Sequence, residues 1–264
     1  MTINACVAVC EGTLSSEIPS KAEHILSNLE TQGVEGRLIG ALSIRLHSHD
    51  RPNIDRPISD IDFVAHSEDR KKIVKVLEGL GYKPAGMFNY VNPNRLLFID
   101  ETDGTRVDVF LDVFEMSHRF NFRERFSIDK PTLPVADLLA TKLQIVQINE
   151  KDLKDITTLL RCHELTQDDS VPDRINVQYI SHLCKDDWGF YKTFTTTIER
   201  ASEYLSQVQL SEAEKADVLA KLKQIRGEIE QVPKTFKWKM RSKIGEKQRW
   251  YNLPETRLVE PGKG

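Results

Sequence analysis

The sequence lacks the features that mark several large classes of protein. It has only four cysteines in 264 residues, without the dense spacing of a secreted disulfide scaffold, so we expect reduced thiols. No hydrophobic run approaches the length that spans a bilayer, and no basic residue precedes the short apolar patch near the amino terminus. Acids and bases nearly cancel, to a net charge of -3, which gives no global argument for a nucleic-acid or membrane partner. These absences favour a cytoplasmic protein with no membrane segment.

The few cysteines leave one alternative open. Cys162-His163 and His182-x-Cys184 can be combined on paper into a zinc site. Neither pair has finger-like spacing, and small buried residues in helices are the more common explanation.

The chain does contain a pair of aspartates, Asp60 and Asp62, inside the short apolar run 59–64. Successive side chains of a strand point to opposite faces, so these two carboxylates share one face. At about 4 Å and an effective dielectric near 20, their repulsion is on the order of 4 kcal/mol, so a folded site needs a cation or a proton there. A hard divalent ion suits such a pair. An isolated Asp-x-Asp more often belongs to a partly solvated edge strand. The neighbouring motifs must therefore decide between a metal-binding pair and a solvated one.

A glycine turn precedes this pair. Residues 37–39 are expected to form a short strand that runs into Gly40, and residues 41–47 a helix. Such a turn allows close approach of a phosphate to the backbone, although a glycine between strand and helix is common. The following loop, 47–57, holds two histidines and two arginines that can either touch a substrate or be solvated. We expect solvation for His47 and His49.

A third acid follows on a predicted hairpin. Residues 96–100 and 106–112 alternate as strands do, and Asp103-Gly104 between them is a strong turn signal. In the second strand Asp108 lies on the face opposite the apolar valines. Two helices are expected beside these strands, over 20–33 with Ser20 as its cap and over 67–79 with Ser67 as its cap.

From Pro131 onward the hydrophobic period becomes helical. We expect helices near 138–148, 153–160, 176–183, 188–205 and 211–231. The sequence therefore predicts an α/β (α+β) protein with a mixed sheet flanked by helices over 1–130, a helical domain over 131–232 and a tail over 233–264.

The tail carries seven basic residues against one acid between positions 234 and 251, with four aromatic residues interleaved. Such a segment can bind phosphate backbones and stack bases. It can also dock on the helical domain, with its aromatic rings buried and its lysines in water, and we favour docking.

Several of these motifs occur together in one known superfamily. In order along the chain they are Gly40-Ala41, Ser59-Asp60-Ile61-Asp62 and Arg106-Val107-Asp108. This set resembles the DNA polymerase beta-like nucleotidyltransferases. The stretches 136–142 and 151–156 are similar to the branch that holds abortive-infection toxins (AbiEii-like) and small-molecule, aminoglycoside-type nucleotidyltransferases. The resemblance covers roughly residues 37 to 160. The family turn is usually Gly-Gly or Gly-Ser, so here a hydroxyl contact is missing or comes from Ser43.

The resemblance implies a site and a reaction. Asp60, Asp62 and Asp108 would hold Mg²⁺ or Mn²⁺, and the phosphates of a nucleoside triphosphate such as ATP would lie over Gly40, Ala41 and Ser43. Lys142 would point at phosphate in the interdomain cleft or snorkel to water. Lys151 and Asp152 would position substrate or merely form local ion pairs.

Three functions remain open at this stage. The first is transfer of a nucleoside monophosphate to a hydroxyl of a small molecule, a protein or RNA. The second is a weak or inactive relative that binds nucleotide or nucleic acid, and the third is a metal-dependent phosphate-ester hydrolase.

Overall fold

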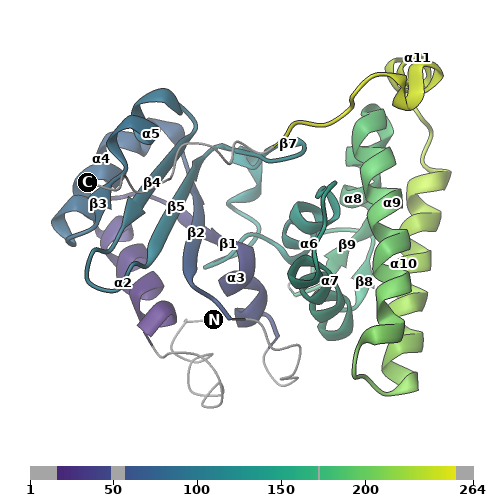
Figure 1. Cartoon of the computed structure of the whole chain (residues 1–264), viewed down its shortest axis with the longest axis horizontal. Helices are drawn as coiled ribbons and strands as arrows, with labels where there is room; N and C mark the ends of the chain where they lie inside the picture. The colour runs from purple at the N-terminus through teal and green to yellow at the C-terminus, as the bar shows by residue number, and fades with distance from the viewer. Residues whose placement is uncertain (1–16, 49–56, 172, 254–264) are drawn as a thin grey trace, which may run out of the picture.

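The computed structural model describes residues 17–48, 57–171 and 173–253, with a sheet first and helices after it (Figure 1). The sheet has five strands in the order β1-β2-β5-β4-β3. Their bounds are β1 Gly36–Ile39, β2 Asp60–Ala65, β3 Lys83–Pro84, β4 Arg95–Ile99 and β5 Arg106–Leu111. Only the central pair β2·β5 is parallel, and the other three pairs are antiparallel. The predicted mixed sheet is confirmed.

Helices cover one face of the sheet and flank it. They are α2 Glu17–Thr31, α3 Gly40–Leu46, α4 Arg70–Gly79 and α5 Gly86–Val91. The alternation of side chains along each strand decides which of the two hydrophobic cores each residue joins. Phe63 and Val109 pack in one core with α2 and α4, whereas their neighbours Val64 and Phe110 belong to a second core shared with the helical region. The sheet is thus buried on both faces.

The helical region follows a short hairpin made of β6 Val113–Glu115 and β7 Arg119–Asn121. Its helices are α6 Val135–Leu143, α7 Glu150–Cys162, α8 Val177–Asp186, α9 Trp188–Tyr204, α10 Glu212–Gln231 and α11 Phe236–Ile244, with β8 Leu165–Thr166 and β9 Ile175–Asn176 as a small parallel pair. Polar side chains cap α7 to α11, as in the capping box of Ser211 and Glu214 on α10, whereas α6 begins after Pro134 without a side-chain cap. No helix within the described residues is long and apolar enough to cross a membrane.

Some predicted boundaries were wrong. Helix α2 begins at Glu17, so Ser20 lies inside it and is not its cap. Ser67 opens a 3₁₀ turn, 67–69, and makes no side-chain cap. The helix expected over 138–148 ends at Leu143. Beyond it the backbone makes a hydrogen bond outside the helix, since the Val146 N–H donates to the Ser117 hydroxyl at 3.4 Å.

The join between sheet and helices runs beside the first strand. The Leu38 N–H donates to the Pro131 carbonyl at 2.9 Å, and the Leu133 N–H donates to the Leu38 carbonyl at 3.1 Å. These bonds fix the start of α6 against β1. The division of the chain at 130 and 232 stays a prediction.

Candidate functional site

The three predicted acids share one face of the sheet. Asp62 on β2 is paired in register with Ile39 on β1 and with Asp108 on β5. Asp60 precedes Asp62 by two residues and so points to the same side. This is the side on which Val64 and Phe110 meet the helical region. The alternation argument from the sequence therefore holds for this face.

Asp62 is the acid with the most unusual environment. Within the described residues no group donates a hydrogen bond to its carboxylate or forms an ion pair with it. The residue keeps some exposure toward a cavity, but burial of the carboxyl, and then the nearby charges of Asp108 and Asp60, raise the pKa of Asp62 to about 7. Lys142 and Arg95 act in the opposite direction. Near neutral pH this carboxyl holds a proton or needs a cation.

Gly40 lies directly against this carboxylate. Its φ of +71° is in the left-handed region, which L side chains rarely adopt, and a Cβ at this position would overlap Asp62 Oδ2. A residue with a side chain would be strained and would push Asp62 away. The glycine of the predicted turn is therefore required by the acid next to it.

Asp108 is held by an arginine. Arg95 Nε donates to Asp108 Oδ1 at 2.6 Å and Arg95 Nη2 to Asp108 Oδ2 at 2.8 Å, a bidentate pair. The guanidinium also lies over the rings of Phe88 and Phe110, at 5.3 Å and 4.9 Å from their centres. The charge of Asp108 is thus compensated within the protein, unlike that of Asp62.

Lys142 on α6 is buried and forms ion pairs with the two aspartates of α7. Its ammonium lies 3.1 Å from Asp152 Oδ1 and 2.8 Å from Asp155 Oδ2. Lys142 and Asp152 also line the cavity, so the ammonium is both in the cleft and locally paired. Lys151 is exposed, and its backbone N–H is capped by Asn149.

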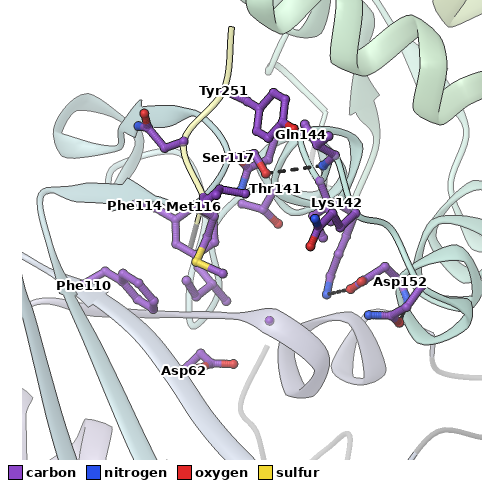
Figure 2. A pocket seen from close by; sticks show the side chains of 18 of the residues that line it. Asp62, Phe110, Phe114, Met116, Ser117, Thr141, Lys142, Gln144, Asp152 and Tyr251 are labelled. Carbon is purple, nitrogen blue, oxygen red and sulfur yellow. Dashed lines mark hydrogen bonds and ion pairs between the residues drawn. The ribbon is translucent and has the colours of Figure 1, made fainter. Parts of the chain in front are cut away.

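A cavity of about 350 Å³ joins these elements (Figure 2). Gly40 and Asp62 lie at the sheet end, and Lys142 and Asp152 come from the helical region. The wall is completed by Ile39, Arg95, Phe110, Phe114, Met116, Ser117, Thr141, Gln144, Ile145, Val146, Gln147, Asn149, Tyr251, Asn252 and Leu253. Residues from the sheet, the helices and the tail therefore meet in one place.

The other predicted residues of the turn are placed differently. Ala41 is half-buried, and Ser43 is buried with its hydroxyl donating to the Gly40 carbonyl at 2.8 Å. In this arrangement the Ser43 hydroxyl stabilises the turn itself.

Two clusters within the described residues bring three possible metal ligands together. They are His47, Asp129 and Asp173, and His66, Glu68 and Asp112. The three predicted acids are not among these clusters, and Asp108 is paired with Arg95. Neither described cysteine belongs to a cluster, and Cys184 is buried in the core, as the simpler of the two explanations predicted.

The expectation that His47 is solvated was wrong. His47 is buried, with Nδ1 2.8 Å from Asp173 Oδ1 and Nε2 2.7 Å from Thr132 Oγ1. Both partners come from distant positions in the chain, which the local sequence does not show. His49 lies outside the described residues.

The tail docks, as expected, over the part of it that the structure describes. Trp250 Nε1 donates to Thr193 Oγ1 of α9 at 3.1 Å, and Arg241 lies over the Trp188 ring. Phe236 on α11 remains 79% exposed, so not every aromatic ring is covered. Sequence reasoning missed that Tyr251 and Asn252 reach the cavity, and it also missed Arg95 and Gln144, which stand at element ends where no periodicity marks them.

Comparison with known proteins gives structural similarity only. No protein-family model matches the sequence, and the search of curated proteins returns no match. The crystal structure of the lincosamide antibiotic adenylyltransferase LnuA with lincomycin bound matches with a TM-score of 0.41 and 18% identity, over 53% of this chain and 94% of that one. The solution structure of the antibiotic-resistance factor ANT(2'')-Ia matches with a TM-score of 0.37 and 12% identity, over 52% of this chain and 80% of that one. Both likenesses are distant in sequence, and each covers about half of this chain.

Proposed function

We propose that the protein is a metal-dependent nucleotidyltransferase, which moves a nucleoside monophosphate group from a nucleoside triphosphate to a hydroxyl of an acceptor. The observation that carries this proposal is the Asp62 carboxylate. It lies at a cavity wall beside Asp60 and Asp108, with no pairing cation among the described residues. A buried acid without a compensating charge destabilises the fold. A bound cation would supply that charge, and a cation at this position could also serve phosphoryl transfer.

A divalent cation suits the donors present. Asp60 and Asp62 offer carboxylate oxygens on one face, and Mg²⁺ or Mn²⁺ prefers oxygen ligands. Asp108 would be the third ligand, and Arg95 would then have to share or release it. When bound, the ion would supply charge neutralisation for the triphosphate and for the departing pyrophosphate.

The chain's own residues have distinct tasks in this proposal. Gly40 leaves room for the Asp62 carboxylate against the turn, over which the phosphates would lie. Lys142 supplies a positive charge inside the cavity, and Asp152 and Asp155 orient its ammonium. Ala41 and Ser43 shape the turn beneath the phosphates, and Lys151 would contact substrate only from the rim.

One observation favours a second candidate, a relative that binds nucleotide without transferring it. The Arg95–Asp108 pair occupies both oxygens of the third acid. If the pair persists when nucleotide is bound, Arg95 competes with a metal ion and with the proton of an attacking hydroxyl for the oxygens of Asp108.

The decisive experiment is incubation with each labelled triphosphate, Mg²⁺ or Mn²⁺ and candidate hydroxyl acceptors, with pyrophosphate release as the readout. We expect Asp62→Asn to abolish release while the fold persists, because it removes charge with little change in shape. Asp186→Asn, which changes an exposed acid on α8, is the matched control and should be unaffected. Unchanged turnover in Asp62→Asn would refute the proposal. Nucleotide binding without release in the wild type would favour the second candidate.

A further inference from the structure

Gln144 lines the cavity and carries an unused hydrogen-bond donor. The His118 backbone N–H donates to Gln144 Oε1 at 2.7 Å. Because a backbone N–H can only donate, the amide oxygen must face His118, and this fixes the direction of the amine. Gln144 is fully buried, and its Nε2 has no hydrogen-bond partner within the described residues. A buried donor without a partner costs free energy, which an occupant with an accepting oxygen can recover.

The C-terminal segment 250–253 forms the wall beside this donor. Figure 1 shows the chain returning from α11 toward the hairpin that contains β7. The Asn252 N–H donates to the Ser117 carbonyl at 2.9 Å, and Asn252 Nδ2 donates to Glu115 Oε1 at 2.9 Å. Tyr251 and Leu253, on either side of Asn252, both line the cavity. Figure 2 shows Tyr251, Ser117 and Gln144 at the end opposite Asp62.

The cavity lining includes an apolar and aromatic part beside the polar Ser117, Gln144 and Asn252. Phe114, Met116 and Tyr251 offer rings and a thioether, and Ile145 and Val146 add aliphatic surface. The two acids that line the cavity, Asp62 and Asp152, come from the sheet end and from the ion pair with Lys142. Such a wall suits a flat, uncharged molecule rather than a polycation, which needs several acids to replace its water.

We propose that Gln144 and the segment Tyr251–Leu253 form the acceptor subsite, and that the acceptor is an uncharged, flat ring compound with a carbonyl oxygen that accepts a hydrogen bond from Gln144 Nε2. The role of this compound as the acceptor rests on the proposed transferase function. Its binding does not depend on that function, because the subsite is complete without nucleotide or metal.

The test is therefore a binding measurement on the full chain without nucleotide or metal. We choose 7-(hydroxymethyl)coumarin as the probe, since it is flat, uncharged at pH 8 and carries both a carbonyl and a hydroxyl. The comparison probe is 2-(hydroxymethyl)naphthalene, which has a similar size and no carbonyl. We expect the wild type to bind the coumarin roughly fivefold more tightly than the naphthalene, the worth of one neutral hydrogen bond. Spermine, a polycation, should not compete.

Two variants and one control complete the design. Gln144→Glu, at pH 8, keeps an acceptor for the His118 N–H and replaces the donating amine by oxygen, so the preference for the coumarin should vanish. Tyr251→Leu removes the ring from the tail and should weaken both probes alike, whether or not Gln144→Glu folds. Gln178→Glu makes the same chemical change at an exposed site on α8 and should change nothing.

The outcomes are separable. Equal affinity for both probes, an unchanged preference in Gln144→Glu, competition by spermine, or no binding of either probe at millimolar concentration would each overturn the proposal. Probe binding as expected without any pyrophosphate release would leave the subsite standing and would count against the transferase function alone.

Discussion

The Asp62 carboxylate lies against Gly40, in the space that a side chain on residue 40 would fill. A Cβ on residue 40 would overlap Asp62 Oδ2, and the backbone there has a φ of +71°. The turn and the acid therefore constrain each other: the glycine permits the approach, and the approach holds the carboxylate at the cavity wall. Two motifs that are separate in the sequence thus form one structural unit.

This contact predicts the effect of Gly40→Ala. The variant should lose about 2 to 4 kcal/mol of unfolding free energy, because the backbone strain of a left-handed alanine is joined by the displacement of Asp62. Gly104→Ala is the matched control, since Gly104 has a φ of +79° and nothing within 4 Å of its Cβ. It should cost only about 1 kcal/mol, from backbone strain alone. Urea unfolding measures the loss of unfolding free energy in both variants. Equal losses would show that displacing the Asp62 side chain costs no free energy.

A second prediction concerns the joint between the sheet and the helices. Arg125 donates to the fully buried Asp137 of α6 from Nη2 at 2.7 Å, and its guanidinium lies 4.0 Å from the centre of the Tyr179 ring. Asp137→Ala should destabilise the protein by about 1.5 to 3 kcal/mol, because Arg125 would lose one of its two carboxylate partners and keep only Asp169, 2.8 Å from its Nη1. Glu199→Ala breaks an exposed pair with Arg226 and should cost less than about 1 kcal/mol. Thermal or urea unfolding of the two variants would contradict this if the losses were similar.

The sequence predicted local features well and long-range pairs poorly. Alternation placed Asp60 and Asp62 on one face, because the period of a strand is a local property, and the parallel register of β2 and β5 brings Asp108 to that face. The pair between Arg95 and Asp108 was missed, since it depends on the register of two antiparallel strands, and a single arginine at a strand's first residue carries no pattern. His47 was missed for the same reason, because Thr132 and Asp173 reach it from other parts of the chain.

The third prediction is a loss of stability in mild acid that depends on His118. This ring is buried, accepts or donates one bond to Thr193 Oγ1 at 2.8 Å and stacks on Phe190, and burial lowers the pKa of His118 to about 4. The unfolded chain binds the proton near pH 6.5 and the folded chain only near pH 4. The neutral ring's contribution is therefore complete above pH 6.5 and is lost as the pH falls from 6.5 toward 4.

The measurement is the difference between wild type and His118→Gln. Because other groups also titrate, unfolding free energies at pH 7 and pH 4.5 are compared for both proteins. The wild type should lose on the order of 2 kcal/mol more than the variant over this interval. His163 keeps its low pKa, about 4, in both proteins and cancels from the difference. If wild type and His118→Gln lost the same unfolding free energy between pH 7 and pH 4.5, the prediction would be wrong. The His118 pocket would then open to water before the ring is protonated.

The last prediction concerns how the tail is seated. A Cβ at Gly189, near the start of α9, would lie 2.8 Å from the Trp250 carbonyl oxygen and 3.1 Å from His118 Cε1, closer than packed atoms allow. Gly189→Ala should therefore push out segment 250–253, which is held mainly by Trp250 on Thr193 and by Asn252 on Ser117. Trypsin should then cut faster after Lys247 and Arg249. Gly227→Ala, with nothing within 4 Å of its Cβ inside α10, should leave that rate unchanged and add about 0.5 to 1 kcal/mol of stability. An unchanged cleavage rate in Gly189→Ala would contradict this prediction. It would mean that the backbone at Trp250 can shift to accept the added methyl group without releasing segment 250–253.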